Sequence, residues 1–498
     1  MPLDLYDAAG SRAADECARR QLKLSGMTLM SRAARAGFAD LVARFPDLKS
    51  ISVWCGKGNN AGDALLIAQQ AVELGLTVQA VGLEPGDRFS GDAATALQQA
   101  QAAGVALQPY AEGVNVEGQV IVDGLLGTGF NGALRAPFAE AIHKLNASGR
   151  PILSIDIPSG VNASTGAVSD TAVRATLTST FITHKIGLHT GAGPSFAGDV
   201  CFHDLGVLGD VLPPPQARGL YADARTLPPL TLATCKHQQG HVLLVGGDSG
   251  MSGAIAMSTE AALRAGAGLV SVATRAAHAP MIVGRTPEAM VRSAEEDSWT
   301  AQLETADLVV LGPGLGREAW GLALFSQVEA SGKPTVLDAD GLYHLAARGS
   351  WQGGALFITP HVGEAARLLD ESTAEVEQDR IASARQLAAQ FNANVCLKGP
   401  GSVVVATEGE AVICQHGNPG MASGGMGDVL AGIAGGLLVA GCRQQLRPSE
   451  LARIFAQAVA LHSAAADAAA VQLGQRSLLA RDVIAALPPL LKLEAQGD

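Results

Sequence analysis

A glycine-rich stretch at 417–428 ends in Asp428 and runs into an apolar, helix-compatible segment at 429–433. Glycines let a backbone approach a ligand closely. The free N–H groups at the start of a helix favour anions, and those of 424–427 are suited to hold a transferred phosphate. Asp428 in that place is also a possible helix cap. A cap does not need so many glycines, so the pattern favours a phosphate-binding loop that delivers a base.

A second glycine-bearing loop, at 56–63, lies between an apolar run at 50–54 and a helical segment at 64–74. With the next apolar run, at 77–83, it predicts a strand–loop–helix–strand unit, which places a ligand at the carboxyl ends of parallel strands. Two asparagines and an aspartate supply polar groups beyond what a turn needs. A turn without a ligand remains the alternative.

Polar side chains also follow the predicted strands at 120–123 and 152–156. A buried carboxylate at a strand end is costly without a partner. Asn60, Asp123 and Ser159 therefore form a candidate cation site. Hard oxygen donors without His or Cys disfavour transition metals but leave monovalent ions, magnesium and calcium open. The alternative is that these residues cap helices.

The composition excludes several classes of protein. A chain of 498 residues predicts two or three domains, and 48% hydrophobic against 16% charged residues excludes a disordered chain. The net charge of −12 argues against nucleic-acid and anionic-membrane partners, although it allows a small nucleotide. Seven cysteines without a C-x-x-C pair are typical of reduced cytosolic thiols.

The ends and the apolar runs point to the same compartment. The N-terminus shows no secretory signal pattern. The most apolar run, at 429–442, is interrupted by glycines and is expected to be too short to span a bilayer. We therefore expect a cytoplasmic protein with no membrane partner.

The elements expected to position these residues form two halves of the chain, and strands alternate with helices in each half. Residues 7–45 predict two or three helices, with breaks at Gly26 and Gly37. Prolines mark a connector between about 213 and 232. Beyond it, strands are predicted at 241–245, 269–273, 307–311, 335–338, 356–359 and 394–398, and helices at 253–265 and 450–470. This alternation predicts a mainly parallel α/β sheet covered by helices.

Three motifs of the first half resemble the epimerase domain of NAD(P)H-hydrate repair enzymes. They are Gly-x-Gly-Asn-Asn-x-Gly-Asp at 56–63, Asp-x-Leu-Leu-Gly-Thr-Gly at 123–129 and Ile-Asp-Ile-Pro-Ser-Gly at 155–160, and 183–187 fits a later stretch. The resemblance implies a Rossmann-like three-layer sandwich over 1–218. This domain would interconvert the R and S forms of hydrated NADH and NADPH (NADHX and NADPHX). The sequence departs from the pattern at Ala61 and Ala64, where the family usually has Gly.

The resemblance also implies site residues. It implies a potassium site at Asn60, Asp123 and Ser159. The implied substrate contacts are Asn59, Asn60, Ala61, Gly62, Asp63, Gly127, Thr128, Gly129, Phe130, Asn131, Gly132, Ala133 and Asp156. Epimerisation needs loss and return of a hydroxyl on opposite faces, through ring opening or an iminium, and Asp156 is the expected catalytic group for the proton. A free Asp, with a pKa of about 3.9, suits a base better than an acid.

Four motifs of the second half are similar to the dehydratase domain of the same enzymes, which has a ribokinase-like α/β fold, here over 219–498. They are Gly-Pro-Gly-Leu-Gly at 312–316, Leu-Asp-Ala-Asp-Gly at 337–341, Thr-Pro-His-x-Gly-Glu at 359–364 and Gly-Gly-x-Gly-Asp at 424–428. The resemblance implies that Asp428 activates the hydroxyl of the S-hydrate to attack a nucleotide phosphate. The phosphorylated hydrate then loses phosphate, which returns NAD(P)H. The bacterial type uses ADP, releasing AMP, and a magnesium ion is expected with the nucleotide.

The implied nucleotide contacts are Lys398, Gly399, Pro400, Gly401, Ser402 and Gly427, and the implied hydrate contacts are Ala254, Gly314, His361 and Asp428. Taken alone, His361 could instead be a histidine at a helix start without a ligand. Two other functions stay open, namely a ribokinase-like small-molecule kinase fused to a nucleotide-binding module and a non-catalytic nucleotide sensor. Parallel-sheet domains of this size often assemble, so we also expect a homo-oligomer.

Overall fold

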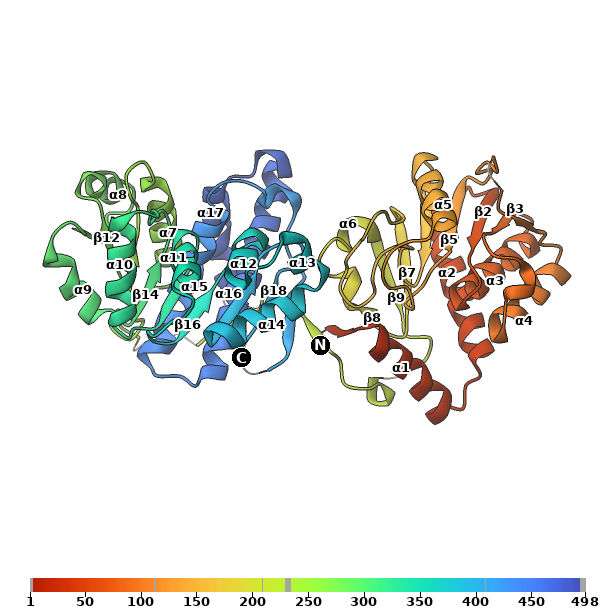
Figure 1. Ribbon diagram of the computed structural model, residues 1–498, viewed down its shortest axis with the longest axis horizontal. Coiled ribbons are helices and arrows are strands. Elements are labelled where there is room, and N and C mark those ends of the chain that lie inside the picture. Colours follow the sequence, from red (N-terminus) through yellow and green to blue (C-terminus); the bar gives the residue numbers. More distant parts are fainter. Residues whose placement is uncertain (1–2, 112, 208, 229–233, 408, 493–498) are drawn as a thin grey trace. The chain divides into compact units, whose positions relative to one another are not determined.

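The computed structural model describes residues 3–111, 113–207, 209–228, 234–407 and 409–492. They form two compact units, Leu3–Arg218 and Gly219–Asp498 (Figure 1). Each unit combines parallel strands with covering helices, so the predicted two-domain α/β organisation is confirmed. Part of the predicted proline-rich connector, at 229–232, lies outside the described residues.

The first unit is built on a parallel sheet in the order β4-β3-β2-β5-β6-β7-β9. Its strands are β2 (Ser50–Cys55), β3 (Thr77–Gly82), β4 (Leu107–Pro109), β5 (Val120–Gly124), β6 (Ile152–Ile155), β7 (Leu177–Phe181) and β9 (Asp199–His203). Outside this seven-stranded sheet, β1 (Leu3–Tyr6) pairs in parallel with β8 (His184–Lys185). The helices are α1 (Ala8–Gln21), α2 (Gly26–Arg44), α3 (Asn59–Glu73), α4 (Gly91–Ala102), α5 (Ala136–Ala147) and α6 (Pro194–Ala197).

Successive side chains of β2 pack on opposite faces of this sheet, as strand geometry requires. Ile51 and Val53 belong to a core cluster shared with α2, α3 and α4. Trp54 belongs to a second cluster shared with α5. The unit therefore has helices on both faces of one sheet, which is the three-layer arrangement that was expected.

Two local predictions for this unit are wrong. Gly37 does not break α2, because it lies buried within the helix, where a Cβ would come within 3.2 Å of Ile67 Cδ1. Tertiary packing thus overrides the usual helix-breaking tendency of glycine. Helix α3 begins at Asn59 rather than at Ala64, so the polar loop residues are its first turns. Ala61 and Ala64 consequently lie in a right-handed helix, where a residue with a Cβ is not strained.

The second unit has the strand order β13-β12-β11-β14-β15-β16-β17-β18-β19. The pairs from β13 to β17 are parallel, and the pairs β17–β18 and β18–β19 are antiparallel. The strands are β11 (His241–Val245), β12 (Leu269–Thr274), β13 (Met290–Ser293), β14 (Leu308–Leu311), β15 (Thr335–Leu337), β16 (Leu356–Ile358), β17 (Ala393–Leu397), β18 (Val403–Val405) and β19 (Ala411–Cys414). Strand β10 (Ala217–Leu220) spans the boundary between the units.

The helices of this unit cover its sheet. They are α7 (Ser252–Arg264), α8 (Ala279–Arg285), α9 (Thr300–Thr305), α10 (Ala319–Ala330), α11 (Asp340–Arg348), α12 (Val362–Leu369), α13 (Thr373–Gln378), α14 (Arg380–Phe391), α15 (Met426–Arg443), α16 (Pro448–Leu473) and α17 (Ala480–Leu491). Helices α15 and α16 are long and apolar enough to cross a membrane. The run at 429–442 was expected to be too short to span a bilayer, and this underestimated the length of the apolar helix, which extends over Met426–Arg443. However, 78% of each apolar window is buried inside the unit, which identifies both as core helices.

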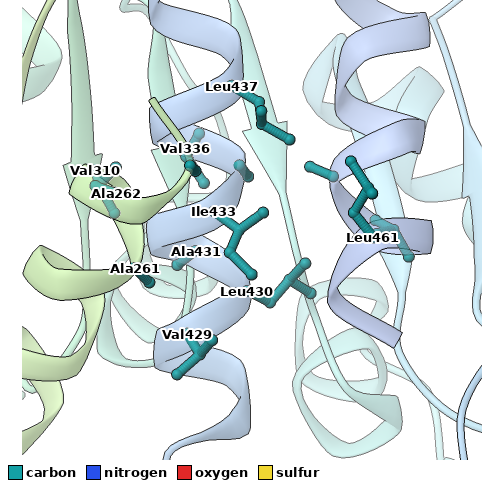
Figure 2. Close-up of a cluster of buried hydrophobic side chains, with 14 of the residues drawn as sticks. Ala261, Ala262, Val310, Val336, Val429, Leu430, Ala431, Ile433, Leu437 and Leu461 are labelled. Atoms are coloured by element: carbon teal, nitrogen blue, oxygen red, sulfur yellow. The ribbon is translucent and has the colours of Figure 1, made fainter. Parts of the chain in front are cut away.

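Helix α15 lies between α7 and α16 over the central strands (Figure 2). Its glycines allow this close packing. A Cβ on Gly432 would lie 2.2 Å from Ser258 O, and one on Gly436 would lie 2.5 Å from Ala262 O, both on α7. A Cβ on Gly435 would meet Val310 of β14 at 2.4 Å. The helix that begins at the glycine-rich loop is therefore packed closely against the backbone of α7 and the Val310 side chain of β14.

Candidate active sites

The first unit contains a cavity of about 140 Å³. Its lining comes from α1, α2, the start of α3, the segments after β5 and β6, and the segment from β7 to β8. The polar lining residues are Ser11, Asp15, Arg19, Asn59, Asn60, Asp63, Asp92, Thr128, Asp156, Thr183 and Lys185. Four aspartates and two cationic residues thus surround a space that also has apolar walls.

Asp156 follows β6 in an unusual backbone conformation. Its φ is +67°, and Ile157 N donates to Ile155 O at 2.8 Å, which closes a three-residue γ-turn around it. The form with positive φ at the central residue is the rare, strained one. Such a non-glycine residue costs roughly 1–3 kcal/mol and persists where its surroundings hold it. Positive-φ residues cluster at functional sites, so this conformation supports a role for Asp156.

A second γ-turn of the same kind lies on the neighbouring strand end. Thr183 N donates to Phe181 O at 2.6 Å around Ile182, whose φ is +63°. A β-branched residue with positive φ is a clear outlier. Ile182 also lines the cavity. Two strained turns therefore present neighbouring residues to one cavity.

The charges around Asp156 are buried and mixed in sign. Lys185, with its side chain only 2% exposed, forms an ion pair with Asp156 Oδ1. Burial, followed by the Asp156 carboxylate, raises the pKa of Asp63 well above its usual range. Burial raises the pKa of Asp15 to about 6. The cavity thus holds two carboxyl groups with raised pKa values beside one fixed ammonium.

The three candidate cation ligands lie around one backbone segment. Ser159 Oγ donates to Asp123 Oδ1 at 2.6 Å and accepts from Leu126 N at 2.8 Å. Asn60 Nδ2 donates to Leu126 O at 3.2 Å and to Ile155 O at 2.6 Å. The predicted convergence of Asn60, Asp123 and Ser159 is therefore present in the fold.

Asp123 is completely buried, and burial raises the pKa of its carboxyl. The hydrogen bonds described for it come from Ser154 Oγ, the Ser159 hydroxyl and N–H, and Leu125 N. All of these partners are neutral. A buried carboxylate without an opposite charge is costly, so a bound cation would offset that cost at this site.

The other implied contacts of the first unit divide into two groups. Asn59, Asn60, Asp63, Thr128 and Asp156 line the cavity. Ala61 and Gly62 lie buried in α3, where a Cβ on Gly62 would meet Met30 Sδ at 2.7 Å. Gly127 lies against the Asn60 side chain, and the stretch 129–133 is outside the cavity lining.

The second unit contains a more open cavity of about 400 Å³. It is lined by Asp338, Ala339, His361, Glu364, Lys398, Gly399, Met426, Gly427 and Asp428. These residues follow β15, β16 and β17 or begin α15, so they share the carboxyl edge of the sheet. The glycine-rich loop is held at its start by Asp467 of α16, which accepts from Gly417 N at 2.9 Å and Asn418 Nδ2 at 2.8 Å.

Asp428 lies in the first turn of α15, and the left-handed Gly425 is the N-cap of that helix. Burial, followed by the Asp338 carboxylate, raises the pKa of Asp428 to about 7, while Lys398 opposes the shift. A carboxyl with this pKa exchanges protons near neutrality, as a general base requires. The arrangement therefore favours the base interpretation over a simple cap, since Asp428 is no N-cap here.

Lys398 is held by two carboxylates. Its Nζ lies 2.8 Å from Asp338 Oδ1 and 3.7 Å from Glu364 Oε2. A Cβ on Gly427 would lie 3.1 Å from Asp338 Oδ2 and 3.2 Å from Lys398 Nζ. Because Gly427 has no side chain, the ion pair between Lys398 and Asp338 can lie directly against its backbone, next to Asp428.

His361 serves as a helix cap and also lines the cavity. Its Nδ1 accepts from Gly363 N at 3.0 Å and from Glu364 N at 3.3 Å, while Glu364 Oε2 accepts from His361 N at 2.7 Å. The helix-start interpretation of His361 is therefore realised. It does not exclude a ligand, because the ring is 60% exposed at the cavity.

The remaining implied contacts of the second unit are outside the lining of this cavity, namely Ala254, Gly314, Pro400, Gly401 and Ser402. Gly314, with φ +61°, leaves no room for a side chain, because a Cβ would meet Met251 at 2.8 Å and Ala254 at 3.3 Å. The two implied hydrate contacts Ala254 and Gly314 are thus neighbours. Ser402 Oγ donates to Gly399 O at 3.0 Å and closes the 399–402 turn that also contains Pro400 and Gly401.

Several residues of both cavities were not assigned a role from the sequence. Lys185 and Asp15 reach the first cavity from β8 and α1, far along the chain from Asp156. Asp338 and Glu364 lie within the motifs at 337–341 and 359–364, and their negative charge was the sequence signal that could have identified them as site residues. Ala339 has φ +49° and ψ −121° at the start of α11, and no sequence signal indicates that strain.

Comparisons with known proteins agree with this two-unit organisation. A family model described as NAD(P)H-hydrate dehydratase matches residues 242–489, and one described as YjeF-related protein N-terminus matches residues 26–187. The chain is 40% identical to the bifunctional NAD(P)H-hydrate repair enzyme Nnr of Coxiella burnetii, over 92% of this chain and 94% of that one. It is 39% identical to the enzyme of that name from Escherichia coli, over 99% and 95%. The structure of the protein SMU.573 from Streptococcus mutans covers 55% of this chain and 100% of its own, at 27% identity and a TM-score of 0.50.

Proposed function

The chain belongs to the family of bifunctional NAD(P)H-hydrate repair enzymes, and we propose how its two cavities divide that work. The first unit, 1–218, epimerises R- and S-NADHX and NADPHX. The second unit, 219–498, dehydrates the S form with ADP, releasing AMP and phosphate. The single observation that carries the proposal is Asp428, a carboxyl with a pKa near 7, in one cavity with Lys398, Gly399 and Gly427.

In the second unit Asp428 takes the proton of the hydrate hydroxyl as that oxygen attacks the terminal phosphate of the nucleotide. The N–H groups at the start of α15 face the transferred group, and one such donor contributes roughly 2.7–4 kcal/mol in transition states of this kind. Lys398, fixed by Asp338 and Glu364, supplies positive charge for the nucleotide phosphates. Phosphate then leaves with the electron pair of its C–O bond, while the ring nitrogen supplies the pair that forms an iminium. Loss of a proton from the neighbouring ring carbon then forms the double bond and regenerates the reduced nicotinamide.

A magnesium ion fits this cavity together with the nucleotide. Magnesium binds through one or two carboxylates and substrate phosphates, and Glu364 offers a carboxylate beside Lys398. The ion would neutralise charge on the transferring phosphoryl group. Among the residues that the structure describes, no group of three His, Cys, Asp or Glu side chains could hold a metal by itself, which fits an ion brought by the nucleotide.

In the first unit Asp156 moves the proton, and Asn59, Asp63 and Thr128 surround the hydrated ring. Asn60, Asp123 and Ser159 would hold potassium, supported by the buried carboxylate of Asp123 with neutral partners. The ion would balance that charge and hold in place the ends of β5 and β6, after which the cavity residues Thr128 and Asp156 follow. We further propose that the protein is cytoplasmic and forms a homo-oligomer. Light scattering on the purified protein tests the oligomeric state.

The deciding experiment follows absorbance at 340 nm on mixed R- and S-NADHX with ADP and magnesium. The intact protein is expected to recover all NADH, and Asp428→Asn none. Asp156→Asn is expected to recover the S fraction quickly and the R fraction slowly, so each variant is the control for the other. No recovery with ADP or ATP would contradict the proposal. A stable phosphoester in place of free phosphate would favour the small-molecule kinase.

A further inference from the structure

Lys185 is a buried cation beside the proposed epimerisation site, and its ammonium group is fully engaged. Its Nζ donates to Asp156 Oδ1, to Thr180 Oγ1 at 3.1 Å and to Phe181 O at 2.8 Å. An ammonium group has three donors. Lys185 therefore has no donor left for a substrate, which points to an effect exerted through Asp156.

These bonds connect the two γ-turns of the cavity. Phe181 O, which accepts from Thr183 N to close the turn around Ile182, also accepts from Lys185. Asp156, at the centre of the other turn, is bound by the same ammonium. One side chain thus holds together two backbone conformations that are each unfavourable alone.

The same contacts distinguish the two oxygens of the Asp156 carboxylate. Within the described residues, its hydrogen bonds come from Thr180 Oγ1 at 3.3 Å, from Phe181 N at 3.2 Å and from Lys185, and all of them reach Oδ1. Oδ2 is the oxygen that these bonds leave for proton transfer.

We propose that Lys185 is a positioning residue for epimerisation, which occupies Oδ1 of Asp156 and joins the two γ-turns so that Oδ2 alone carries the proton. This inference rests on the proposed function of the first unit. In the ring-opening route Oδ2 takes the hydroxyl proton, the hydroxyl oxygen becomes a carbonyl, and the ring C–N bond breaks with its electron pair going to nitrogen. Oδ2 passes the proton to that nitrogen, and the reverse steps close the ring on the opposite face.

The test compares Lys185→Ala with the intact protein on R-NADHX. Misplacement of a catalytic group can reduce a rate about 10²-fold, so kcat for epimerisation is expected to fall by about that factor with KM nearly unchanged. Added methylammonium is expected to restore part of the lost kcat, because it can enter the vacated space. Lys49→Ala removes an exposed lysine of the same unit and is the matched control. Dehydration of pure S-NADHX by the same preparations reports whether the second unit is intact.

A double variant separates positioning from general destabilisation. In an Asp156→Asn background, Lys185→Ala is expected to lower kcat no further, since residues that act as a unit are not additive. If Lys185→Ala does not fold, Thr180→Val tests the inference instead. This change removes one hydrogen-bond donor to Asp156 Oδ1, so kcat for epimerisation is expected to fall, but by less than in Lys185→Ala. A raised KM at unchanged kcat, or an additive double variant, would overturn the inference. Failure of the intact protein to epimerise would instead refute the proposed function itself.

Discussion

Lys398 Nζ lies 2.8 Å from Asp338 Oδ1, and this ion pair lies against the backbone of Gly427. Asp338 is almost completely buried, with 1% of its surface exposed. The ammonium proposed to meet the nucleotide therefore also neutralises a buried carboxylate. Its position is fixed before the nucleotide arrives, which limits the reorganisation needed during phosphoryl transfer.

Gly427→Ala is expected to weaken nucleotide use. The added carbon would lie 3.1 Å from Asp338 Oδ2 and 3.2 Å from Lys398 Nζ, so the ion pair must shift away from the cavity. We expect KM for ADP in dehydration to rise about tenfold, a change of about 1.4 kcal/mol. Gly424→Ala, whose added carbon meets nothing within 4 Å, is the matched control with a much smaller expected effect. Equal effects of the two changes would refute this explanation.

The dehydration rate should depend on pH through Asp428. Its pKa is raised to about 7, so the carboxylate needed as a base is lost as the pH falls through that value. We expect kcat/KM for S-NADHX to fall about tenfold for each pH unit below 7 and to level off above it. A stopped-flow profile between pH 5.5 and 8.5, roughly one and a half units either side of 7, measures this dependence.

Glu364 also has a pKa raised to about 7, so the assignment of that profile needs a control. In Glu364→Gln the fall below pH 7 should persist at a lower absolute rate, because Asp428 still titrates. A profile that becomes flat in Glu364→Gln would assign the titration to Glu364 and contradict the prediction.

Potassium should stabilise the first unit through Asp123. Replacing KCl by choline chloride is expected to lower its unfolding temperature and slow epimerisation, because the buried carboxylate loses its counter-charge. Asp123→Asn, which removes that charge, should make unfolding insensitive to potassium, and Ser159→Ala should weaken the response. Equal unfolding temperatures of the intact protein in both salts would favour the alternative that these residues only cap helices.

Ala339→Gly should not destabilise the second unit, unlike an ordinary alanine-to-glycine change. Ala339 has φ +49°, a conformation that costs a residue with a Cβ roughly 1–3 kcal/mol and glycine almost nothing. Ala346→Gly in the same helix α11 is the control and should cost about 1 kcal/mol. Thermal unfolding of both variants checks this, and equal losses of stability would contradict it.

Much of the fold could be predicted because its signals are local. Apolar runs that are followed closely by glycine, proline or aspartate correctly predicted the strands β11, β14, β15, β16 and β17. Strand β12 was predicted from its apolar run alone. The errors at Gly37 and at the start of α3 arose where packing decides the outcome. Gly37 is buried within α2, where an added Cβ would lie only 3.2 Å from Ile67 Cδ1. Asn59 begins α3 although its neighbours are typical turn residues.

The sites could be predicted only where a motif brings its residues together. Asp156 and Asp428 could be singled out because each stands at the edge of a glycine-bearing segment. The bonds from Lys185 to Asp156 join residues 29 positions apart, and Lys398 and Asp338 are 60 apart. Neither pairing has a spacing rule, because it depends on which strands lie side by side. The positive φ of Ile182 is likewise a product of its tertiary surroundings.

The glycines of α15 also bear on how this protein can vary over evolution. Gly432 and Gly436 touch the backbone of α7 from the same helix that carries Asp428 in its first turn. A larger residue at either position would push the helix aside and move the base with it. Substitutions tolerated in an ordinary core would therefore act here as active-site changes. We expect sequence drift along this helix to be slow and to be matched by compensating changes at Ser258 and Ala262.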